Sequence, residues 1–149
     1  MTKTTTTSTS DLATVVRQFL GAAALTITLN VEPVPASRPR VSKWGTYYGK
    51  TYEKFRKEAK NQLFDHNGEK IEGPINALIE VVVTKPKTTK REYPRGDVDN
   101  FAKGPLDSLT SHANVWEDDD QIIGLAVFKR FAEPGEPAAV HVHYAKAGE

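Results

Sequence analysis

Residues 96–121 read GDVDNFAKGPLDSLTSHANVWEDDDQ, and this stretch decides how the rest of the chain is interpreted. Its 26 residues hold seven acids and one base, Lys103, so their formal net charge is −6. Carboxylates held close together raise one another's pKa unless a cation or solvent neutralises them. We therefore expect a divalent cation here. The acids are Asp97, Asp99, Asp107, Glu117, Asp118, Asp119 and Asp120.

Two basic blocks precede this acidic stretch. Residues 36–60 carry eight bases and two acids, and residues 85–95 carry five bases and one acid, which gives net charges of +6 and +4. Basic segments around an acidic cluster suit a polyanion that must approach carboxylates, as in a nuclease. Charge runs also occur as ordinary solvated faces, so the blocks alone do not identify a nuclease.

The composition limits the other possibilities. A chain of 149 residues can bury one core, so we expect a single domain. The absence of cysteine excludes disulfides and thiolate metal sites, so a metal must be held by oxygen or histidine. No apolar run is long enough to span a membrane or to form a signal-peptide core. We expect a soluble, cytoplasmic protein that does not bind membranes.

Hydrophobic periodicity predicts an α/β (α+β) domain with a mixed sheet of about four strands and two main helices. Residues 75–84, rich in Ile and Val, are expected to form a buried strand. The segment 36–50 has no regular period, and we interpret it as an exposed basic loop. The connection between the last two strands is expected to be a hairpin loop. The expected strands are 25–31, 75–84, 121–131 and 138–146, and the expected helices are 51–66 and 101–110.

The first 23 residues are interpreted as an extension that precedes a domain spanning residues 24–149. Residues 2–10 are almost entirely Thr and Ser, so we expect the first ten residues to be disordered. Asp11 is a candidate cap for a helix that continues to about Ala23.

The acidic stretch suits metal-assisted phosphodiester hydrolysis, because Mg²⁺ prefers oxygen ligands and keeps several of its waters. Asp97 and Asp99 would point to the same side of an extended segment. A third ligand would come from Asp118 to Asp120, just before a strand. Lys103 lies one helical turn after Asp99, where it could hold a phosphate.

Each motif has ordinary explanations when taken alone. A D-x-D pair is often a turn or a cap, and a DDD run is often a solvated loop. An EF-hand is excluded because its glycine and its final glutamate are missing. Glycine-rich phosphate loops and a G-x-S-x-G elbow are also absent. His141 and His143 alternate in an expected strand, which favours a place on the sheet surface over metal binding.

The order and spacing of these motifs resemble the RusA family of Holliday junction resolvases of bacteria and their phages. The matching elements are D-x-D-N-x-x-K at residues 97–103, D-x-L at 107–109 and v-x-x-D-D-x-Q-v at 115–122. Residues 35–40, Pro-Ala-Ser-Arg-Pro-Arg, resemble the basic segment after the family's first strand. The resemblance covers about residues 25–146.

The resemblance implies roles for individual residues. The family's three metal-binding aspartates fall on Asp97, Asp99 and Asp119, and its catalytic lysine falls on Lys103. Asp120 stands where the family usually has a small or polar residue, so Asp118 or Asp120 remains possible as the third ligand. We interpret Asp107 as a structural acid. Trp116 is interpreted as a packing residue.

The resemblance also implies an activity in DNA recombination and repair. It implies an Mg²⁺-dependent homodimer, in which Mn²⁺ can substitute, that binds a four-way DNA junction. It would resolve the junction by paired symmetric nicks that leave 5′-phosphate ends. The candidate phosphate contacts are Arg38, Arg40, Lys43, Arg91 and Arg95.

Trp44, Tyr47 and Tyr48 are candidates either for contacts with opened bases or for packing. Two other functions stay open at this point. One is a DNA-junction-binding module with impaired catalysis, and the other is a metal-binding or acidic interaction domain that does not bind nucleic acid.

Overall fold

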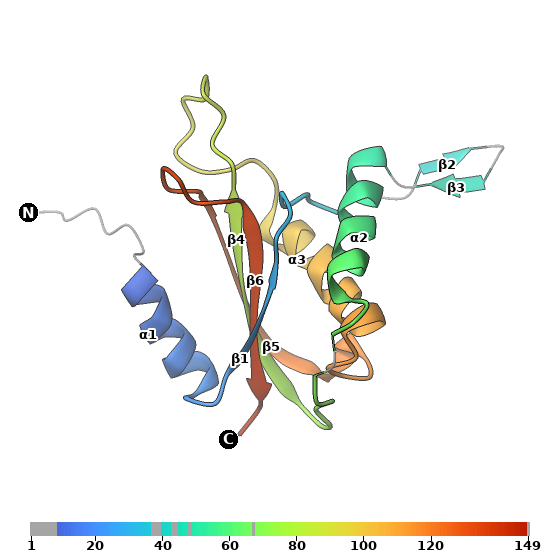
Figure 1. Cartoon of the computed structure of the whole chain (residues 1–149), viewed down its shortest axis with the longest axis vertical. Coiled ribbons are helices and arrows are strands. Elements are labelled where there is room, and N and C mark those ends of the chain that lie inside the picture. Colours follow the sequence, from blue (N-terminus) through green and yellow to red (C-terminus); the bar gives the residue numbers. More distant parts are fainter. Residues whose placement is uncertain (1–8, 37–39, 43–44, 48, 67, 149) are drawn as a thin grey trace, which may run out of the picture.

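The computed structural model describes residues 9–36, 40–42, 45–47, 49–66 and 68–148. It contains a four-stranded sheet with helices on both faces, and a separate small hairpin (Figure 1). The α+β fold with a mixed four-stranded sheet is therefore confirmed. The helices are α1 (Thr9–Leu20), α2 (Lys50–Leu63) and α3 (Val98–Ser108), and the strands are β1 (Leu25–Leu29), β2 (Arg40–Ser42), β3 (Gly45–Tyr47), β4 (Ile75–Val83), β5 (Ile122–Phe131) and β6 (Ala139–Lys146).

Strand β4 lies inside the sheet, whose strand order is β1-β6-β4-β5. It pairs antiparallel with β6 and parallel with β5. Ile79 and Val81 face the core formed with α2 and α3, whereas Leu78 packs against α1 on the opposite face. Burial on both faces explains the nearly continuous apolar sequence of β4, because neither face can carry polar side chains freely.

The expected hairpin between the last two strands is wrong. Strands β5 and β6 are antiparallel to each other, but β4 lies between them in the sheet. The loop 132–138 therefore passes over the end of β4. The parallel pair β4–β5 in turn needs a crossover connection, which contains α3.

The segment expected to be a loop at 36–50 contains the β2–β3 hairpin, in which Val41 pairs with Thr46 and Ser42 with Gly45. Three-residue strands are too short for periodicity to reveal them. Residues 37–39, 43, 44 and 48 lie outside the described part of the chain. The exposed basic loop expected at these positions stays a prediction.

The N-terminal helix begins at Thr9 and ends at Leu20, where Gly21 has a φ of 90° and its N–H donates to the Arg17 carbonyl. This glycine ends the helix earlier than the expected Ala23. Thr9 and Ser10 are helical rather than disordered, and residues 1–8 lie outside the described part. None of the described helices has the length and apolar character to cross a bilayer.

Helices α2 and α3 pack against each other on the face of the sheet opposite α1. The buried face of α2 carries the four residues that its periodicity indicates, Tyr52, Phe55, Ala59 and Leu63. Helix α3 starts at Val98, three residues before the predicted start, and continues into a π-helical turn at Leu109–Ala113. A Cβ atom at Gly104 of α3 would lie 2.9 Å from Phe55 and 3.1 Å from Tyr52.

This contact predicts the sign of one substitution. Gly104→Ala should lower the free energy of unfolding by about 1–2 kcal/mol, because overpacking against the Phe55 ring exceeds the gain in helix propensity. Urea denaturation followed by circular dichroism would measure the change. Helix propensity alone predicts a more stable protein, so stabilisation by Gly104→Ala would contradict the packing argument.

Candidate active site

Asp97 and Asp99 lie at the start of α3, where the loop that follows β4 ends. Asp97 occupies the N-cap position with extended backbone angles, and Asp99 lies in the first helical turn. The expectation that both lie in one extended segment is therefore wrong. Both side chains are exposed, and the Asp97 carboxylate makes no capping hydrogen bond. The positive end of the helix dipole favours carboxylates at this position.

The chain just before Asp97 is anchored to β5. Lys129 Nζ donates to the carbonyl oxygens of Pro94 and Gly96 at 2.7 and 2.6 Å. Gly96 has a φ of 100°, and a Cβ atom there would lie 2.8 Å from the Phe101 ring. A glycine is therefore required at residue 96, and Asp97 has a fixed position relative to the C-terminal half of β5.

Lys103 and Asp107 continue along α3 from Asp99. The three residues are four positions apart, which places them on one side of the helix. Lys103 is exposed and Asp107 is half-buried. Asp99 and Asp107 are eight residues apart, which corresponds to about 12 Å along the helix axis. We call the side of α3 that carries Asp99, Lys103 and Asp107 the α3 stripe.

The other acids form a tight 3-10 turn, Asp119–Gln121, directly before β5. The Asp118 carboxylate caps this turn by accepting a hydrogen bond from the Asp120 N–H at 2.9 Å. The Gln121 side chain accepts from the N–H groups of Glu117 and Asp118 and donates to the carbonyls of Ile71 and Gly73. Asp118 and Gln121 thus shape the turn, whereas Asp119 projects from it.

Asp119 lies in an environment dominated by negative charge. Partial burial raises its pKa above the usual value, and Asp118, Asp107 and Asp120 raise it further. Asp107 is therefore close to Asp119, although the sequence suggested only a structural role for it. The signal available in the sequence was its helical spacing from Asp99 and Lys103.

The expected metal ligands do not all lie close together within a single copy of the chain. Asp97 and Asp99 lie at the N-terminal end of α3, whereas Asp107 lies near its C-terminal end and Asp119 lies in the 3-10 turn before β5. In the described part of the chain, no three Asp, Glu or His side chains are placed to hold one metal ion.

The expected DNA contacts fall into two groups. Arg91 and Arg95 lie in the loop that leads to Asp97, and Arg95 is exposed. Arg40 lies in β2, whereas Arg38 and Lys43 lie outside the described residues, as do Trp44 and Tyr48. Only Arg91 and Arg95 can therefore be located beside the candidate site.

Trp116 is a packing residue, as expected. Its side chain is 1% exposed, its Nε1 donates to Thr110 Oγ1 at 2.7 Å, and its ring meets Tyr144 edge-on. The indole thereby supports the segment that precedes the 3-10 turn Asp119–Gln121, which we call the acidic turn.

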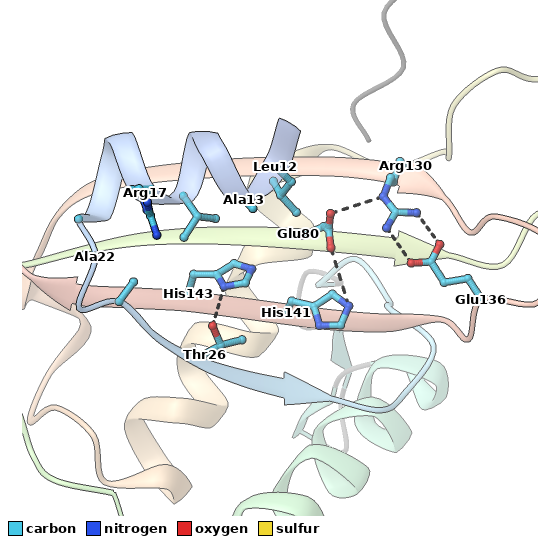
Figure 2. A pocket seen from close by; sticks show the side chains of 13 residues that line it. Leu12, Ala13, Arg17, Ala22, Thr26, Glu80, Arg130, Glu136, His141 and His143 are labelled. Atoms are coloured by element: carbon cyan, nitrogen blue, oxygen red, sulfur yellow. Dashed lines mark hydrogen bonds and ion pairs between the residues drawn. The ribbon is translucent and has the colours of Figure 1, made fainter. Parts of the chain in front are cut away.

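A second polar cluster lies on the opposite face of the sheet, in a cavity of about 470 Å³ beneath α1 (Figure 2). Glu136 forms two charged hydrogen bonds to Arg130, at 2.6 and 2.7 Å. Arg130 Nε also lies 3.5 Å from the buried Glu80. His141 and His143 are hydrogen-bonded to Thr28 and Thr26. These contacts are internal to the sheet and α1, and the α3 stripe lies on the other face.

Comparison with protein families gives a match to the family model Endodeoxyribonuclease RusA over residues 30–142. The chain belongs to the RusA endodeoxyribonuclease family. Membership in this family indicates endodeoxyribonuclease activity, and the family acts on branched DNA junctions. Comparison with curated proteins gives no match. Helix α1 lies outside the matched residues, whereas the α3 stripe and the acidic turn lie within them.

The Arg130–Glu136 pair predicts an acid sensitivity of the fold. Hydrogen bonds from Arg130 lower the pKa of Glu136 to about 2, from an ordinary value of 4.5. A lowered carboxyl pKa stabilises the folded state above the unfolded pKa, and this stability is lost as pH falls from about 4.5 towards about 2. Glu136→Gln should lower the free energy of unfolding by about 1–3 kcal/mol at pH 7 and by much less at pH 3.

Denaturant unfolding at the two pH values would measure both effects. Glu133→Gln is the matched control, because Glu133 is exposed in the same loop and its hydrogen bonds to Glu136 use its backbone N–H and carbonyl. Equal losses in the free energy of unfolding for the two variants would contradict a stabilising role of the Arg130–Glu136 pair.

Proposed function

We propose that this protein is an Mg²⁺-dependent Holliday junction resolvase that makes paired symmetric nicks and leaves 5′-phosphate ends, with Mn²⁺ as a substitute for Mg²⁺. The observation that carries the proposal is the placement of the acids. Asp97 and Asp99 are exposed at the N-terminal end of α3, Lys103 is exposed further along the α3 stripe, and Asp119 is exposed in the 3-10 turn before β5. Family membership supports the same activity.

The side chains of Asp97, Asp99 and Asp119 fit a hard divalent cation. All three offer carboxylate oxygen, the ligand that Mg²⁺ prefers. Partial burial raises the pKa of Asp119, and the negative charges of Asp118, Asp107 and Asp120 raise it further, which a bound cation would counteract. When bound, the ion would supply Lewis-acid stabilisation of the phosphate and an activated water. Asp118 already caps the turn, which supports Asp119 as the third ligand.

Lys103 would provide positive charge on the exposed side of α3. A lysine there can hold the scissile phosphate and offset the charge that develops in the transition state. Arg91 and Arg95 would hold flanking phosphates, because their loop leads directly into Asp97. These contacts would position the DNA backbone without reading its sequence.

A homodimer would bring the separated acids together at one site. We propose that Asp97 and Asp99 of one protomer share a metal site with Asp119 of the partner subunit. A two-fold axis generates two such sites, which matches two nicks in a junction that is itself two-fold symmetric. The absence of a three-ligand group within the described residues of one chain supports this arrangement.

Strand β5 is the best candidate for the contact. It is an edge strand, and it exposes Ile123 and Leu125, which are 69% and 44% exposed. An exposed apolar edge strand readily pairs with another strand. Antiparallel pairing centred on Gly124 would bring the turn that carries Asp119, just before β5, towards the Lys129 end of β5 in the partner subunit. Lys129 contacts Gly96, which is adjacent to Asp97.

The function is tested with a mobile four-way junction and Mg²⁺. The wild-type protein should nick it, and Asp97→Asn, Asp99→Asn and Asp119→Asn should each reduce nicking by about 100-fold or more while junction binding is kept or strengthened. Asp119→Asn should also keep or raise the free energy of unfolding, because it removes a carboxylate from a repulsive group.

Tight, salt-sensitive binding by the wild type without nicking in Mg²⁺ or Mn²⁺ would instead favour a catalytically impaired junction-binding module. Loss of folding in all three variants would show that the acids are structural.

The shared site is tested by mixing two inactive variants. If Asp99 and Asp119 act from different protomers, a heterodimer of Asp99→Asn and Asp119→Asn contains one site with neither substitution. After subunit exchange, an equal mixture should recover about a quarter of the wild-type sites and give single nicks rather than pairs. Absence of recovery, with exchange verified, would place the site within one chain.

The β5 contact has its own test, because the chain contains no cysteine. Ile123→Cys should be cross-linked into dimers by a short bis-maleimide. Leu25→Cys should not, although Leu25 is 49% exposed on β1, the other edge of the sheet. Cross-linking of Leu25→Cys alone would move the interface to β1.

A further inference from the structure

An apolar pocket of about 320 Å³ lies beside the N-terminal end of α3. Its walls are the rings of Pro33, Pro35, Pro86, Pro94, Phe101 and Phe131. Gly96 also lines it, and Asp97 is the next residue in the chain. A mostly apolar, preformed hollow with a few polar groups at its edge is the usual form of a small-ligand site.

The charged side chains that line this pocket are cationic. Arg91 and Arg95 line it, and Lys85 Nζ lies 5.9 Å from the centroid of the Phe131 ring. The Arg91 guanidinium is held in place, because its Nε donates to the Tyr93 carbonyl at 3.2 Å and it stacks on the Tyr93 ring at 4.8 Å. The loop 85–95 carries a net charge of +4. An occupant should therefore combine a flat apolar part with adjacent negative charge.

We propose that this pocket binds one unstacked nucleobase of the substrate strand next to the scissile phosphate, with the flanking phosphates on Arg91 and Arg95. Bases stack on aromatic rings in a sequence-tolerant way, and a branch point already has unpaired or weakly stacked bases. The inference rests on the proposed nuclease function and adds a base-binding subsite to it. Positioning one base would set which phosphate faces Asp97 and Asp99.

Thr89 provides a way to fill the pocket. It lines the pocket and is half-buried, and its hydroxyl accepts a hydrogen bond from the Arg91 N–H at 3.2 Å. Thr89→Trp would occupy the space meant for the base. Thr88→Trp adds the same bulk at an exposed neighbour that does not line the pocket.

The test measures binding to four-way junctions that carry a single abasic site at successive positions around the nick. For the wild type, one position should weaken binding by about 5-fold to 150-fold, the usual effect of losing a stacked base. Thr89→Trp should bind the intact junction more weakly by a similar factor and should show no further loss at that position. Thr88→Trp should keep the wild-type abasic profile.

A junction that is bound and nicked equally well with abasic sites at every position would overturn the base-binding pocket and leave the nuclease function intact. An unchanged abasic effect in Thr89→Trp would do the same, because the base would then stack elsewhere. A wild-type protein that binds no junction would overturn both proposals. A 2-aminopurine probe at the sensitive position should brighten on binding to the wild type and remain quenched with Thr89→Trp.

Discussion

The parallel pairing of β4 with β5 is the constraint on which the candidate site depends. Two parallel neighbours cannot be joined by a tight turn, so the chain must cross from the end of β4 to the start of β5. Helix α3 lies within this crossing and packs against α2 through Gly104. Asp97 and Asp99 lie where the crossing enters α3, and Asp119 lies in the turn where it enters β5. The candidate catalytic groups are therefore attached to the most deeply buried part of the fold.

The same constraint separates the acids that would share a metal ion. One group, Asp97 and Asp99, is anchored to the C-terminal half of β5 through Lys129. The other, Asp119, is fixed at the start of β5 by Asp118 and Gln121. Neither group can move to the other without breaking the sheet. A two-fold partner along β5 brings the groups together without distortion, and exposed apolar side chains on that strand are then functional rather than a liability.

The two faces of the sheet have different electrostatics. Beneath α1, charges are paired, as in the Arg130–Glu136 contact, and the pKa of His143 is lowered by burial and by His141. Around α3, partial burial and the neighbouring carboxylates of Asp118, Asp107 and Asp120 raise the pKa of Asp119. Paired charge contributes to stability, whereas unpaired like charge costs stability and is retained where a ligand can neutralise it. The contrast supports a functional role for the α3 face.

Periodicity and composition determined much of this protein from sequence alone. The buried strand and the apolar face of α2 follow from local residue patterns, because burial imposes a period of two or of 3.6 on the chain. The resemblance to the family rests on the order and spacing of the acidic motifs, and Trp116 beside them is interpreted as a packing residue. The tertiary structure alone decided the position of β4 between β5 and β6, the helical start at Val98 and the proximity of Asp107 to Asp119. These features depend on contacts between residues distant in sequence, and a local pattern carries no record of which strand will be a neighbour.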